Sequence, residues 1–159
     1  MNMQQAAERS DALLDSTFNA INPSVQWAHD DTTSGSCDLT RRRAVMTDIS
    51  EARRGSFLGT VERFWRESGY EIVSVNASQK YPAIFARTPD GFGINVEIAD
   101  QGQAHFEVNT PCVEKSEVAA PSTPPNGPAY ENVEIPRPNV RSDFWSVATP
   151  VPSAVPGGG

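Results

Sequence analysis

The stretch that decides the fold, Tyr81 to Thr110, reads "YPAIFARTPDGFGINVEIADQGQAHFEVNT". Apolar and polar side chains alternate in three segments of it, which predicts β-strands at residues 81–88, 92–99 and 104–110. Pro89-Asp90-Gly91 suits a three-residue hairpin loop, a type I turn followed by a glycine in the left-handed region. A second loop, centred on Gly102, joins the next two strands, so the stretch predicts an antiparallel sheet.

The turns also predict which residues share a face of this sheet. The first loop sets Ala86 opposite Ile94, and the second sets Ile98 opposite Phe106. A slip of one residue would turn the apolar side chains outward, so the pattern predicts a single buried face. That face comprises Ile84, Ala86, Phe92, Ile94, Val96, Ile98, Phe106 and Val108. The opposite, polar face comprises Phe85, Arg87, Asn95, Glu97, His105, Glu107 and Asn109.

Two helices are predicted earlier in the chain. Residues 6–21 carry apolar side chains at helical spacing and end before a proline, which predicts an amphipathic helix. The second helix is expected to begin at a cap on Asp48 or Ser50, with Glu51 forming a capping box with Asp48, and to end at Gly69. Its apolar stripe comprises Phe57, Leu58, Val61, Phe64 and Trp65.

Further strands are predicted around the second helix, at residues 24–29, 41–49 and 70–77. The polar segment 30–38 is expected to be the loop between the first two. The order is therefore α-β-β-α-β-β-β, with one more strand if 70–77 and 81–88 are separate. This order predicts an α+β fold, a two-layer sandwich with two helices packed on one face of an antiparallel sheet.

The chain divides by composition into two parts. From Ser116 onward it holds nine of its thirteen prolines. We therefore predict an α+β domain at 5–115 and a Pro-rich extended tail at 116–159. The tail also carries large apolar residues, and Phe144 and Trp145 are its expected docking residues. The open sheet face around Phe85 is one candidate place for them to dock.

Charge and hydropathy exclude some classes of partner. The net charge of −7 and the sequence pI of about 4.8 argue against nucleic acid or an anionic membrane as a main partner. No apolar run approaches the length that spans a bilayer. The first residues, "MNMQQAAERSD", lack the regions of a signal peptide, which suits either a cytosolic chain or the mature segment of an exported one.

The two cysteines, Cys37 and Cys112, lie in the first strand-to-strand loop and just after the last strand. A bridge between them would close a loop of about 75 residues and add roughly 4 kcal/mol by restricting the unfolded chain. Both have polar neighbours, whereas buried free cysteines lie in apolar runs. We therefore favour a disulfide and an oxidising compartment over two free thiols in a cytosolic chain. A redox-active pair is disfavoured because no CxxC spacing is present.

The polar face holds the residues with catalytic potential. The predicted register sets Glu97 opposite Glu107, and such a pair can act as acid and base. The alternative is that the two glutamates have no catalytic role and lie on an exposed sheet face, bridged by a cation such as Arg87. His29 and His105 lie near carboxylates but show no metal-binding spacing, so we expect no metal and no cofactor.

A run of arginines stands out in this acidic chain. Arg41, Arg43, Arg53 and Arg54 form a candidate basic patch that would receive an acidic partner or a phosphate. The alternative is a solvated strand edge, whose charges resist pairing with another sheet. No phosphate-binding or dinucleotide-binding glycine motif accompanies them.

The chain contains the motifs "SGSCD", "FWRESGYEI", "PDGFGINVEI" and "NTPCV". Together these motifs resemble small exported proteins of actinobacteria, many of which are predicted lipoproteins. The resemblance covers roughly residues 6–113 and rests mainly on an early loop cysteine paired with a terminal "TPC". It implies export and, in the precursor, a signal peptide and a lipid-attachment cysteine. It implies no specific activity and does not include the Pro-rich tail.

We therefore predict a non-enzymatic, extracytoplasmic binding or structural domain whose partner is a protein or another cell-envelope component. Its candidate contact surface is the polar face, with Phe85, Arg87, Glu97, His105 and Glu107. One alternative is a small hydrolase or metal-dependent enzyme that uses Glu97, His105 and Glu107. Another is an intracellular adaptor whose Pro-rich tail binds a groove-type domain.

Overall fold

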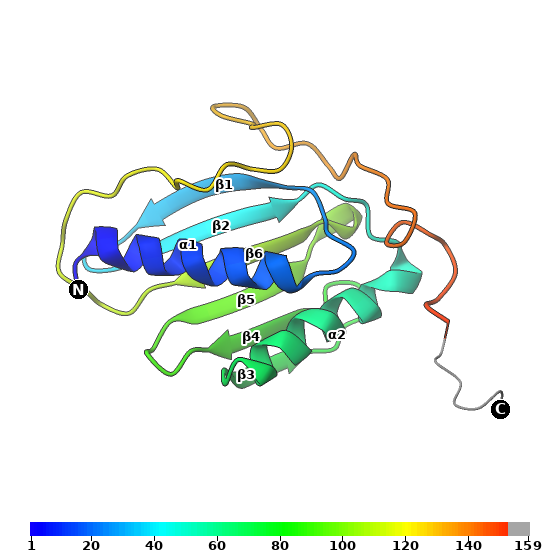
Figure 1. The fold of residues 1–159 in the computed structure, drawn as a ribbon, viewed down its shortest axis with the longest axis horizontal. Helices are drawn as coiled ribbons and strands as arrows, with labels where there is room; N and C mark the ends of the chain where they lie inside the picture. Colours follow the sequence, from blue (N-terminus) through cyan, green and yellow to red (C-terminus); the bar gives the residue numbers. More distant parts are fainter. Residues whose placement is uncertain (153–159) are drawn as a thin grey trace.

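The computed structural model describes residues 1–152, which form two α-helices and one six-stranded antiparallel sheet (Figure 1). The elements are α1 Met3–Ala20, β1 Trp27–Ser34, β2 Leu39–Val45, α2 Glu51–Glu67, β3 Glu71–Asn76, β4 Ala83–Arg87, β5 Gly93–Ile98, the short 3₁₀ helix η1 Asp100–Gly102 and β6 Ala104–Asn109. Both helices pack on the same face of the sheet (Figure 1). The predicted α+β fold and order of elements are confirmed, and the additional strand is present.

The order of strands in the sheet is β1-β2-β6-β5-β4-β3, so β6, the last strand in the sequence, lies inside the sheet between β2 and β5. This order brings the end of β6 beside the loop between β1 and β2. Cys37 and Cys112 consequently lie with their Cα atoms 4.8 Å apart and form a disulfide. The predicted bridge is confirmed.

The β4–β5 hairpin has the predicted register, and the β5–β6 hairpin does not. Ala86 faces Ile94, and Gly91 adopts a φ of 88° in the loop. Ile98, however, faces Ala104 rather than Phe106, because η1 makes the second turn tighter than a loop centred on Gly102 alone would be. The shift is an even number of residues, so every side chain stays on its predicted face. The predicted apolar face is buried, and none of its eight residues is more than 3% exposed.

Three local predictions are wrong. The polar segment expected as a loop continues β1 as far as Ser34, since its main chain pairs with β2. Helix α1 begins earlier than predicted because Asn2 and Gln5 form a capping box. Helix α2 has Ser50 as its N-cap, but no capping box forms, and the Ser50 hydroxyl donates instead to the Val147 carbonyl at 2.6 Å.

Residues 114–140, which we call the strap, run from the start of α1 past the β1 edge of the sheet to the segment that follows β2, with a loop that projects above β1 (Figure 1). The strap begins where the Glu114 carbonyl accepts from the Met3 amide at 2.8 Å, and it ends where Val140 forms a β-bridge with Thr47. Beyond it, Trp145 is 1% exposed and belongs to the main hydrophobic core.

The core residues around Trp145 lie on the helix side of the sheet. The indole ring packs edge-on against Phe57 of α2 at a centroid distance of 5.5 Å, and its N–H donates to the Pro23 carbonyl at 2.6 Å. The open sheet face around Phe85 is therefore not where the tail aromatics dock, and Phe85 stays 37% exposed.

Candidate functional site

All five residues of the predicted contact surface lie on the sheet face opposite the helices: Phe85, Arg87, Glu97, His105 and Glu107. The expected carboxylate pair does not form, because Glu97 faces His105 and Glu107 faces Asn95. The Glu107 carboxylate instead accepts from the Arg42 guanidinium of β2 at 2.6 Å. The acid–base pair on which the hydrolase alternative depended is thus absent. As a contact surface, this face stays a prediction.

No metal-binding cluster is present among residues 1–152, in the sense of three or more converging His, Cys, Asp or Glu side chains. The two histidines lie on opposite sides of the sheet plane. His29 pairs with inward-facing Arg43, whereas His105 pairs with outward-facing Glu97.

The four arginines do not form an exposed basic patch, and the strand-edge alternative is also wrong. Strand β2 lies inside the sheet, between β1 and β6, and its residues alternate between the two faces. Arg41 and Arg43 point toward α1 and are 3% and 1% exposed. Arg53 is buried on α2 and donates to the Thr149 carbonyl at 2.6 Å, while the Arg54 guanidinium lies 3.9 Å from Glu51.

The two buried arginines of β2 form ion pairs with α1, which carries acidic residues one helical turn apart. Arg41 contacts Asp11 at 3.1 Å, and Arg43 contacts Asp15 at 2.5 Å. Burial raises the pKa of the Asp11 carboxyl, and the Arg41 guanidinium offsets part of that rise.

The same ion pairs also hold the strap. Arg41 donates to the Ala119 carbonyl at 2.8 Å, and the Asp15 carboxylate accepts from the Thr123 hydroxyl at 2.9 Å. The arginines predicted to bind a partner therefore bind a segment of their own chain.

The strap then crosses the free edge of β1, where Asn126 takes the place of a neighbouring strand. Its side-chain oxygen accepts from the Trp27 amide and its nitrogen donates to the Val25 carbonyl, both at 2.9 Å. Gly127 follows directly, and a Cβ there would lie 2.7 Å from Cγ of Gln26. A larger residue at position 127 would therefore require the Gln26 side chain to move.

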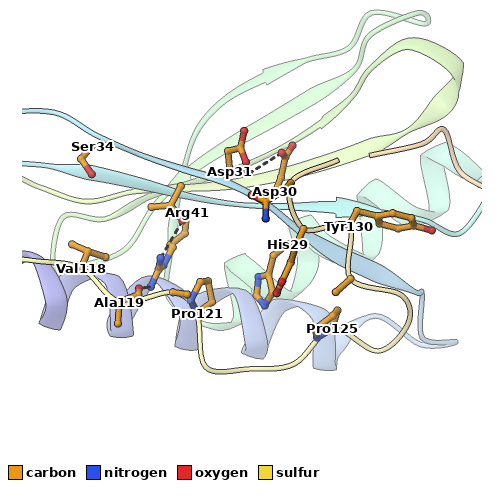
Figure 2. Close-up of a pocket in the computed structure, with 15 residues that line it drawn as sticks. His29, Asp30, Asp31, Ser34, Arg41, Val118, Ala119, Pro121, Pro125 and Tyr130 are labelled. Carbon is orange, nitrogen blue, oxygen red and sulfur yellow. Dashed lines mark hydrogen bonds between the residues drawn. The ribbon is translucent and has the colours of Figure 1, made fainter. Parts of the chain in front are cut away.

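Two cavities flank this crossing. The first, of about 620 Å³, lies between β1 and strap residues 118–132, and we call it the edge cavity (Figure 2). The second, of about 630 Å³, lies over the outer sheet face beside strap residues 130–135, and we call it the face cavity. Both are lined by His29, Asp30, Asp31, Tyr130 and Asn132. The face cavity also reaches His105 of the predicted contact surface.

A β-bulge positions the two adjacent carboxylates. Asp30 pairs with Arg42 and Thr33 with Thr40, so two residues of β1 lie opposite one residue of β2. Figure 2 shows the Asp30 and Asp31 side chains on the same side of β1, away from α1. In a regular strand, consecutive side chains would point to opposite faces.

The lining of both cavities is acidic. Four carboxylates line one or both of them: Asp30, Asp31, Glu131 and Glu134. None of the four forms an ion pair with another described residue. Over residues 1–152 the only lysine or arginine in either lining is Arg41, whose charge is matched by Asp11. A concave surface with one sign of charge concentrates oppositely charged ligands.

His29 lines both cavities and is hydrogen-bonded to the strap. Its Nε2 lies 2.6 Å from the Thr123 carbonyl and donates a hydrogen bond to it, and its ring meets Trp27 edge-on at 4.8 Å. Burial lowers the pKa of His29, although the bond to Thr123 opposes this shift. The native state therefore favours the neutral imidazole.

We expect acidification to destabilise the protein through this histidine. A folded-state pKa below the unfolded value of about 6.5 means that the stabilisation is complete above that value and falls as pH decreases through it. The H29Q variant keeps a donor for Thr123 but does not titrate. Chemical denaturation near pH 7.5 and pH 5 should show a smaller loss of unfolding free energy in H29Q than in the unmodified protein. An equal loss in both would contradict this assignment.

The sequence interpretation placed the contact surface on the polar face and missed Tyr130, Glu131 and Glu134, which lie in a segment expected to be an extended tail.

Neither α1 nor α2 is long and apolar enough to cross a membrane. Comparisons of the chain with models of protein families, with curated proteins and with solved structures each found no match.

Proposed function

We propose that this protein is a non-enzymatic, extracytoplasmic binding domain that holds a cationic group of a cell-envelope partner in the edge and face cavities. The observation that carries the proposal is the group of four carboxylates around Tyr130, at the strap crossing, that form no ion pair with any residue of 1–152. The bound group is an ammonium or guanidinium, such as a lysine or arginine side chain of a partner protein.

The chemistry of the lining suits such a group. Asp30 and Asp31 are adjacent on one side of the strand and offer several acceptor oxygens for a charge-assisted hydrogen bond. Tyr130 lines both cavities and offers an aromatic face to a cation, while Asn139 donates to its hydroxyl at 3.4 Å. The apolar part of the edge-cavity lining, from Val118 to Pro121, suits the methylene stem of a lysine or arginine.

One structural observation, the disulfide, supports an extracytoplasmic location, and the resemblance noted in the sequence implies the same. The Cys37–Cys112 disulfide lies at the surface and is a structural bridge without redox-motif spacing, which is typical of oxidising compartments. The resemblance to small exported actinobacterial proteins points the same way. The adaptor alternative loses support because the Pro-rich segment lies against the domain, where residues 118–125 line the edge cavity.

The test is calorimetric titration with a tetralysine peptide and with spermidine, each at low and physiological salt. The variant D30N/D31N removes two lining charges, and E67Q/E71Q removes two exposed charges outside both linings. We expect D30N/D31N to weaken binding about tenfold, since two lost ion pairs at a partly exposed site cost about 0.7 kcal/mol each and a tenfold change is about 1.4 kcal/mol. E67Q/E71Q should change affinity less than about twofold.

Two outcomes would count against the proposal. Equal weakening by both variants would mean that the probes respond only to net charge. No measurable binding of either probe at low salt would exclude a cation site in these cavities.

A further inference from the structure

The two edge strands of the sheet, β1 and β3, differ in whether another segment of the chain is bonded to them. The free edge of β1 is covered by the strap, with Asn126 bonding its main chain and Thr123 bonding His29. The other edge, β3, is the strand farthest from the strap crossing (Figure 1). Within residues 1–152, no main-chain group of β3 is hydrogen-bonded to anything except β4.

Strand β3 also exposes apolar side chains. Val73 and Val75 are 47% and 51% exposed, among the most exposed large apolar residues of the described chain. The segment Glu71–Asn76 has one feature that discourages pairing with another sheet, the bulge at Val73, which leaves that residue without a partner on β4. It has no proline and no lysine, and no segment within residues 1–152 forms main-chain hydrogen bonds along its outer edge, so these usual protections of an edge are missing.

We infer that two copies of this chain pair through β3, antiparallel and with the two-fold axis at Ser74, so that two six-stranded sheets become one continuous sheet. The inference does not depend on the proposed cation site, which lies at the opposite edge of the sheet.

The sequence of the strand is self-complementary in this arrangement. It reads Val-Ser-Val about Ser74, so Val73 would face the partner's Val75, and Val75 would face the partner's Val73. Cross-strand pairs of β-branched residues stabilise antiparallel sheets. Glu71 is the one charged residue of β3, and it lies on the far side of the bulge from Ser74, so the two Glu71 side chains of a dimer would lie at opposite ends of the paired segment and would not face each other. A two-fold interface must match its own surface, and this strand does so without opposing like charges.

The first test is sedimentation equilibrium of the full chain from about 1 µM to 1 mM, a range that covers weak association. We expect a concentration-dependent dimer for the unmodified protein and for V133K, which adds a lysine at an exposed valine of the strap. V73K/V75K should lose at least tenfold in dimer affinity because like charges would face each other in the paired strands. A monomer throughout the range would overturn the inference, as would a dimer equally strong in V73K/V75K.

The second test measures register by cross-linking. The S74C variant places two thiols at the two-fold axis, whereas N76C places each thiol opposite the partner's Ile72. Mild oxidation should give a covalent dimer of S74C and little of N76C, with the native disulfide checked by peptide mass. Cross-linking of N76C alone would show another register, and equal cross-linking of both would show random collision. Either result would overturn the two-fold axis at Ser74.

Discussion

The W145A variant should lose about 3–5 kcal/mol of unfolding free energy, as is usual when a fully buried tryptophan is truncated. The indole of Trp145 fills the space beside Phe57 and donates to the Pro23 carbonyl. Its own carbonyl accepts from the Ser50 amide at 3.0 Å, at the start of α2. Truncation therefore leaves a cavity in the core and removes the donor of the Pro23 carbonyl, and the cavity accounts for most of the loss.

Urea denaturation followed by circular dichroism measures this loss. W145F keeps most of the buried area but not the N–H donor, so we expect it to lie between W145A and the unmodified protein. V133A truncates a residue of the strap that is 62% exposed and should change stability by less than about 0.5 kcal/mol. A W145A loss as small as that of V133A would mean that Trp145 does not belong to the core in solution.

Removing the disulfide should lower the unfolding free energy by a similar amount, but through the unfolded state rather than through packing of the folded state. The bridge joins residues separated by 75 positions, so C37A/C112A is expected to lose roughly 4 kcal/mol, mainly because the unfolded chain gains freedom. The Val113 amide donates to the Cys37 carbonyl at 2.7 Å, and because this bond joins main-chain atoms we expect the alanine substitutions to keep it.

The urea m-value separates this route from damage to the folded state. An unfolded chain without the bridge is more expanded, so C37A/C112A should show a larger m-value, whereas W145A should leave it nearly unchanged. A stability loss below about 1 kcal/mol in C37A/C112A would show that the loop-entropy argument does not describe this bridge.

The β4–β5 hairpin was predictable to the residue because its determinants are local. Pro89 and Gly91 favour their own backbone angles, and those angles set the register of the flanking strands. The next turn was not predictable to the residue. Gln101 adopts a φ of 62°, which few residues other than glycine favour, and the pairing of Ile98 shifts from Phe106 to Ala104.

The environment of the β2 arginines could not be predicted from the residues next to them in the sequence. Arg41 and Arg43 look like part of an exposed basic patch, and they are buried because Asp11 and Asp15 of α1 lie above β2 and pair with them. Those acidic residues are about thirty positions away in sequence. No window of sequence that contains the arginines also contains their partners.

By itself, the sequence determined the α+β fold, the buried face of the sheet and the bridge between Cys37 and Cys112, because periodicity, turn residues and the placement of two cysteines express them directly. Only the tertiary structure decided that the Pro-rich segment is a strap and that an acidic site lies beneath it. Asn126 meets Val25 across 101 positions, and Thr123 meets His29 across 94. Contacts of that range depend on how the whole sheet closes, which composition and periodicity do not encode.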